Sequence, residues 1–192
     1  MLGKLARWLR MLGYDTIYEN DRTDPELISI AKRDGLVLLT SDEQLYRTAT
    51  MRGLESFLVT GRTEPERLAN LADRFKLNLT IDAANSRCPV CGFPIEERPK
   101  AEVQSSVPPA TFKVYQTFWV CTNPKCTKVY WQGSHWQKIE QTLENARKIL
   151  ETRTNATTLR EQTKPRGRQT ASSNSTPRNN NLPSVQADNP ST

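Results

Sequence analysis

The residues with the clearest chemistry are four cysteines, which fall in two close pairs. Two residues separate Cys88 from Cys91, four separate Cys121 from Cys126, and 29 residues lie between the pairs. Structural Zn²⁺ sites use four such ligands in a tetrahedron, with two to four residues between the members of a pair. Gly92, directly after the first pair, allows the backbone to turn under a metal. The spacing therefore predicts a structural zinc site.

The cysteines and the single histidine also allow other interpretations. Four cysteines can also be four unrelated thiols, or form two disulfides in a secreted domain. Residues 1–15, however, lack the apolar core and cleavage site of a signal peptide. His135 is the single histidine and could replace one cysteine as a ligand. Four thiolates already complete the shell, so we expect His135 beside the site or on a nucleic-acid-binding face.

Aspartates follow the ends of two predicted strands. Asp42 comes two residues after the uncharged run 36–40, and Asp24 opens a helix after the strand candidate 16–18. Carboxylates without His or Cys suit Mg²⁺ or Mn²⁺, and two such ions can activate a water and stabilise the leaving oxygen of a phosphodiester. Helix capping is the alternative role for both residues, and Asp21 also reads as an ordinary loop residue.

The first 85 residues alternate between helix and strand signals, which predicts an α/β fold with a parallel sheet flanked by helices. In such sheets ligands bind beyond the carboxyl ends of the strands, where Asp42 is expected. Leucines at helical spacing, glycine stops and short apolar runs give this order: helix 2–12, strand 16–18, helix 25–34 with Asp24 as its N-cap, strand 36–40, helix 43–51, strand 54–59 and helix 64–75.

The segment around the cysteines reads as a zinc ribbon. Residues 111–120 are rich in β-branched and aromatic side chains and predict a strand leading into Cys121, and residues 128–131 predict the return strand. The ribbon contains four aromatic residues that could stack on nucleic-acid bases: Trp119, Tyr130, Trp131 and Trp136. They could instead be buried in ribbon packing, which we expect for Trp119 and Tyr130.

The C-terminal part differs from the rest in composition. Residues 152–192 hold six basic and two acidic side chains and no aromatic residue, so they should be disordered. Such a basic tail either touches nucleic acid or is solvated without a partner. We expect four parts: a core at 1–85, the ribbon at 86–136, a helix at 137–151 and the tail. No apolar run is long enough to span a membrane, and we expect a cytoplasmic protein.

Five segments together resemble one known family. Residues 1–15, 24–28, 38–42, 88–92 and 128–136 are similar, in the right order, to the Mut-seven C-terminal ribonuclease domain. The resemblance covers about residues 1–149. It implies a PIN-like α/β nuclease core with a zinc ribbon, and RNA cleavage by a carboxylate cluster.

The resemblance also implies roles for particular residues. By position, Asp42 and Asp24 match catalytic acidic residues, Asp21 is a possible additional one, and Lys4 and Arg7 match basic positions that hold phosphate. Lys4 and Arg7 could equally form a solvated helix face. Members of the family usually have an aspartate-bearing strand before the Met-Leu-Gly motif, so we expect the first strand of the sheet to be missing here. A second departure is Thr127, where a glycine would favour a tight turn.

Two functions follow from these observations. The first is a ribonuclease that uses Mg²⁺ or Mn²⁺ for catalysis, carries structural Zn²⁺ and acts on RNA. The alternative is a non-catalytic RNA-binding zinc-ribbon protein, either a truncated or a decayed nuclease.

Overall fold

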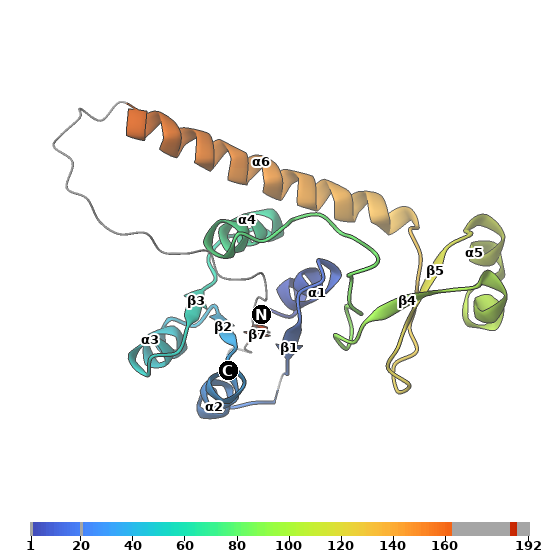
Figure 1. Cartoon of the computed structure of the whole chain (residues 1–192), viewed down its shortest axis with the longest axis horizontal. Coiled ribbons are helices and arrows are strands. Elements are labelled where there is room, and N and C mark those ends of the chain that lie inside the picture. Colours follow the sequence, from blue (N-terminus) through green and yellow to red (C-terminus); the bar gives the residue numbers. More distant parts are fainter. Residues whose placement is uncertain (1, 20, 163–184, 188–192) are drawn as a thin grey trace.

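The structure is a computed structural model that describes residues 2–19, 21–162 and 185–187. It contains an α/β core and a smaller antiparallel sheet at one end of the molecule (Figure 1). In chain order the core elements are α1 (Gly3–Met11), β1 (Thr16–Tyr18), α2 (Asp24–Asp34), β2 (Val37–Thr40), α3 (Glu43–Met51), β3 (Ser56–Leu58) and α4 (Glu64–Phe75). The remaining elements are β4 (Ile95–Arg98), η1 (Lys100–Ser106), α5 (Pro109–Val114), β5 (Phe118–Cys121), β6 (Val129–Tyr130), α6 (Ser134–Gln162) and β7 (Val185–Ala187).

The core sheet is parallel, as the alternation of helix and strand signals predicts. Its strand order is β1-β7-β2-β3. β7 pairs with β1 on one side and with β2 on the other, both in parallel, so β1 and β2 are joined through a strand that comes from far along the chain. A PIN-like identity for this core stays a prediction.

Helices cover both faces of the sheet because β2 has apolar side chains on both of its faces. Val37 and Leu39 belong to a cluster with α1, α4 and α6. Leu36 and Leu38, whose side chains point the other way, pack with α2 and α3. Figure 1 shows the same division, with α2 and α3 on one side of the strands and α1, α4 and α6 on the other.

The helix boundaries follow the capping signals, with one adjustment. Thr23, and not Asp24, is the N-cap of α2, because Glu26 and Thr23 form a capping box. Gly35 then ends α2 in the left-handed conformation, with φ 65°. The same box recurs at Thr63 and Glu66 at the start of α4.

The smaller sheet has the antiparallel order β4-β5-β6. β6 lies within the predicted return strand, but the strand predicted over residues 111–120 is wrong for its first part. Residues 109–114 form α5, and β5 begins only at Phe118. Pro109 at the first helical position explains the difference, because its fixed φ suits a helix start.

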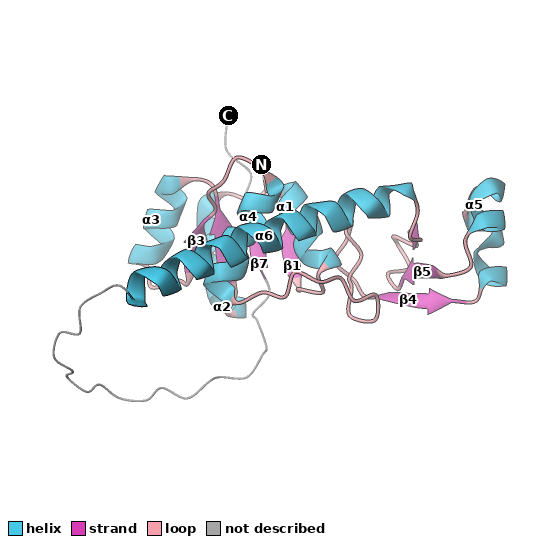
Figure 2. Ribbon diagram, turned by 90° about the horizontal axis from the view of Figure 1, so that it is seen from above, coloured by secondary structure: helices cyan, strands magenta, loops and turns pink. Residues whose placement is uncertain are grey.

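Helix α6 crosses the core and begins beside the small sheet (Figure 2). It packs along α4 and extends beyond the range 137–151 expected from the sequence. Arg147 of α6 donates a 2.7 Å hydrogen bond to the carbonyl of Leu79. Of the tail expected at 152–192, the end of α6 and β7 are described, while residues 163–184 and 188–192 lie outside the described part of the chain. Within the described residues, no helix is both long enough and apolar enough to cross a membrane.

Candidate functional site

The four cysteines come together at one end of the small sheet. Cys88 and Cys91 lie on the turn before β4, Cys121 is the last residue of β5, and Cys126 lies in the loop before β6. All four sulfur atoms lie within 4.8 Å of one another, and none forms a disulfide. His135 is not part of this group.

The sulfur geometry fits a tetrahedral metal ion. The Cys88 and Cys126 Sγ atoms are 3.8 Å apart, and those of Cys91 and Cys121 are 3.4 Å apart. A tetrahedron with zinc–sulfur bonds of about 2.3 Å has sulfur–sulfur edges of roughly 3.8 Å. The donor set and its spacing are therefore compatible with a zinc ribbon.

Tyr130 on β6 supports the cluster with its hydroxyl, which lies 3.0 Å from the Cys88 Sγ. Burial alone would raise the pKa of the Cys88 thiol. Hydrogen bonds from Tyr130 and from the backbone of Cys91 and Val90 instead lower this pKa to about 7. Burial raises the pKa of Cys121. The hydrogen bonds from Tyr130 and the backbone thus favour the thiolate of Cys88, which is the form that binds a metal.

Arg10 connects the cysteine turn to the core. It lies on the buried face of α1, where its Nε donates to the Thr16 carbonyl at 2.9 Å. Its Nη1 donates to the carbonyls of Pro89 and Val90 at 3.3 and 3.0 Å. One guanidinium therefore holds the strand β1 and the cysteine turn together.

The turn itself depends on backbone conformation. Gly92 has φ 82°, as the glycine after a cysteine pair requires, and a Cβ there would lie 3.2 Å from Arg10 Nε. The second turn has no glycine, and Thr127 adopts φ 48° instead. A β-branched residue is rare in this region of backbone space.

The acidic residues lie at the edge of the sheet that the sequence predicted, but they are exposed. Asp42 follows the carboxyl end of β2, and its Oδ1 accepts hydrogen bonds from the backbone N–H groups of Gln44 and Leu45 at 2.6 and 2.9 Å. Asp42 is therefore the N-cap of α3.

Asp24 begins α2 after the end of β1, and Asp21 precedes it in the loop. Because β1 and β2 both run parallel to β7, these residues and Asp42 share the carboxyl edge. Among residues 2–19, 21–162 and 185–187, however, the cysteines are the one group of three or more potential ligands close enough to share an ion. The described acidic side chains are not gathered in that way, and a catalytic Mg²⁺ or Mn²⁺ site stays a prediction.

The predicted phosphate-binding residues are both exposed on α1. Lys4 and Arg7 are three residues apart on a helix, so they lie on one face, and Met11 continues that face one turn later. The side chain of Met11 lines a pocket between the core and the small sheet.

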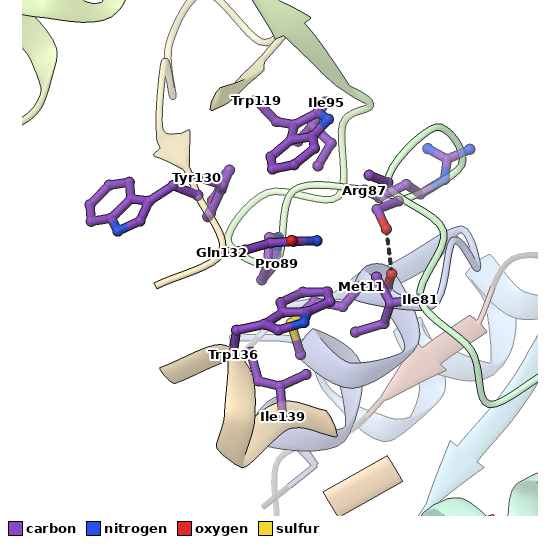
Figure 3. Close-up of a pocket in the computed structure, with 13 residues that line it drawn as sticks. Met11, Ile81, Arg87, Pro89, Ile95, Trp119, Tyr130, Gln132, Trp136 and Ile139 are labelled. Carbon is purple, nitrogen blue, oxygen red and sulfur yellow. Dashed lines mark hydrogen bonds between the residues drawn. The ribbon is translucent and has the colours of Figure 1, made fainter. Parts of the chain in front are cut away.

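This pocket was not predicted from the sequence. It has a volume of about 110 Å³ and is bounded by the end of α1, the loop around residues 81–89, the small sheet and the start of α6. Figure 3 shows Trp119 and Trp136 on opposite sides, with Gln132 reaching in between them. The aromatic residues were visible in the sequence, but nothing in their spacing indicates that they surround one cavity.

Arg10 was also missed, because an arginine within an amphipathic helix ordinarily faces solvent. The leucines at helical spacing already account for α1. Nothing in that pattern indicates that Arg10 contacts the cysteine turn. Met11 and Ser86 complete the junction, since the Ser86 hydroxyl donates to the Met11 carbonyl at 2.7 Å.

Comparison with family models adds one observation to this geometry. The model of the Mut7-C RNAse domain matches residues 1–143. The chain belongs to the Mut7-C RNAse domain family. The Mut7-C range includes the four cysteines, the acidic edge and the pocket, so the resemblance drawn from the sequence is confirmed. Membership in the Mut7-C family suggests a nuclease-like function on RNA.

Comparison with curated proteins and with solved structures gave no match.

Proposed function

We propose that this chain is a metal-dependent ribonuclease that hydrolyses phosphodiester bonds of RNA. The observation that carries the proposal is the Mut7-C RNAse domain match over residues 1–143. The parallel sheet supports it, since Asp24 and Asp42 follow the carboxyl ends of β1 and β2, where ligands bind in sheets of this kind. Their carboxylate oxygens suit Mg²⁺ or Mn²⁺, which would supply an activated water.

The cysteine cluster has a separate role in this proposal. We assign it structural Zn²⁺, held by Cys88, Cys91, Cys121 and Cys126. Four cysteine ligands leave no open position for substrate or water, which is the pattern of structural zinc and not of catalytic zinc. The cluster therefore stabilises the small sheet, and about one zinc per chain is expected.

The proposal predicts a specific effect of Asp42→Asn. Asparagine is as good an N-cap as aspartate, so α3 should be retained while the negative charge is lost. We expect cleavage of single-stranded RNA with Mn²⁺ or Mg²⁺ to fall by at least about a hundred-fold, with unchanged zinc content and melting temperature. The measurement is the rate of cleavage of a fluorescently labelled RNA.

Asp34→Asn is the matched control. Asp34 is exposed and lies at the last position of α2, at the opposite edge of the sheet, where it pairs with Arg33 at 2.6 Å. The same loss of charge there should leave cleavage unchanged. Equal cleavage rates for Asp42→Asn and its parent would leave Asp42 as a helix cap only.

A second function remains, which is RNA binding without cleavage. It is favoured by the capping role of Asp42 and by the exposed, ungathered carboxylates described above. It requires that the parent protein binds RNA and does not cut it with any divalent ion. The cleavage assay separates the two functions directly.

A further inference from the structure

The pocket at the junction of core and small sheet has an unusual lining. Three of the four tryptophans of the chain border it, namely Trp119, Trp131 and Trp136. The fourth, Trp8, packs against the core cluster instead. Trp131 also packs against Tyr115 and Phe118 within the ribbon, so the half-buried rings of Trp119 and Trp136 supply the aromatic surface of the pocket.

The rings of Trp119 and Trp136 and the amide of Gln132 line the interior of the pocket. Trp136, with Met11 beneath it, forms one side, and Trp119, beside Ile95, forms the other (Figure 3). The exposed Gln132 extends between them, and its side-chain amide makes no hydrogen bond to another residue in the described part of the chain. Its amide offers two donors and one acceptor.

This combination is the chemistry that recognises a nucleobase. Aromatic side chains stack on any base because every base has a π-face, and an amide can hydrogen-bond to the base edge. The small volume of about 110 Å³ favours a single flat ring over a helix or strand of a protein partner.

The charge next to the pocket fits the same ligand. Lys4 and Arg7 are exposed on the helix face that ends at Met11 in the pocket wall. A nucleotide whose base occupies the pocket would place its phosphate near positive charge rather than near an apolar surface. An apolar peptide gains nothing from these two cations.

We propose that this pocket binds one unpaired base of single-stranded RNA, stacked on Trp136 and Trp119 and contacted by Gln132. The proposal rests on the RNA substrate of the proposed function and adds a site for it away from the carboxylates. The pocket would hold the strand, while cleavage takes place elsewhere on the core.

The test is a titration with AMP, GMP, CMP and UMP, followed by the four tryptophan indole N–H signals in NMR spectra of the zinc-loaded full chain. These nucleotides contain no phosphodiester to cleave, so binding is measured independently of activity. The signals of Trp119 and Trp136 should shift, and that of Trp8 should not.

Two variants sharpen the test. Trp136→Ala should weaken binding of hexauridylate, measured without added Mg²⁺ or Mn²⁺, by about ten-fold, and Trp136→Phe should restore most of it. Gln132→Leu should retain stacking and reduce the difference in affinity among the four nucleotides. Phe93→Ala is the matched control, because Phe93 is an exposed aromatic residue of the ribbon outside the pocket.

Several outcomes would overturn the proposal. No shift at Trp119 and Trp136 with any nucleotide or with hexauridylate would do so, as would equal losses for Trp136→Ala and Phe93→Ala. Displacement of these signals by an apolar peptide, with no response to nucleotides, would assign the pocket to a protein partner instead. If RNA is cleaved but nothing binds in the pocket, the pocket proposal fails and the proposed function stands. If nucleotides bind in the pocket but RNA is not cleaved, the ribonuclease proposal fails and the pocket proposal stands.

Discussion

The hydroxyl of Tyr130 is the single side-chain group, outside the cysteines themselves, that hydrogen-bonds to a described cysteine sulfur. It lowers the pKa of Cys88 together with backbone N–H groups. Groups in such a supporting position commonly change metal affinity by ten- to a hundred-fold when they are removed. Substitution of Tyr130 therefore tests metal binding while all four cysteine ligands stay in place.

Tyr130→Phe should weaken zinc binding at pH 7 by about ten-fold. Without the hydroxyl donor, the pKa of Cys88 rises from about 7 toward its ordinary value of 9.0, so protons compete with the metal at higher pH. The difference should shrink as pH approaches 9, because about half or more of the Cys88 thiol is then ionised in both proteins. Chelator competition across this pH range measures the effect. Tyr115→Phe removes a ribbon hydroxyl that does not contact a cysteine and should change nothing.

Thr127→Gly should stabilise the zinc-loaded protein by about 0.5–1 kcal/mol. A side chain in the left-handed region costs about 1–2 kcal/mol, and the greater freedom of glycine in the unfolded chain offsets part of the gain. Thermal unfolding should show a rise of about 1–4 °C for a chain of this size. The neighbouring Thr122 does not have a positive φ, so Thr122→Gly should lower the melting temperature. A fall for both variants would contradict the strain at Thr127.

At the scale of elements, the small sheet has little apolar material of its own. Its cluster of buried residues consists of Val103, Val107 and Phe118, while the core has two larger clusters. Cys121 ends β5 and Cys126 precedes β6, so a metal would tie these strands to the turn that holds Cys88 and Cys91. The stability of β4, β5 and β6 should therefore depend on the metal more than that of the core.

Removing zinc with a strong chelator should disorder the small sheet and leave the core folded. Hydrogen exchange should become fast at β4 and β5 and stay slow at β2 and α4. Adding Zn²⁺ should restore protection, and adding Mg²⁺ should not, because thiolates prefer the softer ion. Uniform loss of protection across both parts would show instead that the core cannot fold without the ribbon.

Most elements of the core could be predicted from the sequence because each has a local cause. The capping boxes, the glycine stops and the uncharged run before Asp42 place α2, α3, α4 and β2 to within a residue or two. Residues 111–114 could not be placed, since aromatic and β-branched composition outweighed the proline signal for α5. The cysteine cluster was predictable from spacing alone, whereas the pocket and the contacts of Arg10 depend on tertiary packing.

For the whole molecule, β7 is an element that no sequence signal indicated. It has three residues in a polar stretch, yet it lies between β1 and β2. Its position is defined by main-chain pairing with strands on both sides. Main-chain pairing uses backbone groups that every residue except proline supplies. The polar composition of residues 152–192 therefore gave no indication of β7.

Ending the chain at Gln162 should lower the melting temperature by at least about 4 °C, or roughly 2 kcal/mol, because β1 and β2 lose their shared partner. Gln186→Pro should have a similar effect, since proline removes a ladder hydrogen bond from a central strand. Gln186→Ala keeps the main-chain N–H and should be neutral. Unchanged melting of both the shortened chain and Gln186→Pro would mean that β7 contributes nothing to the sheet.

The position of β7 also sets the order in which the molecule can assemble during synthesis. β1 and β2 leave the ribosome early but are bridged only by a segment that follows α6. Until that segment appears, the two strands have open edges facing one another, which are the kind of edges that bind other chains. The central sheet has contacts of high sequence separation, which slow folding. A nascent chain of this protein should therefore need a chaperone for longer than its size would suggest.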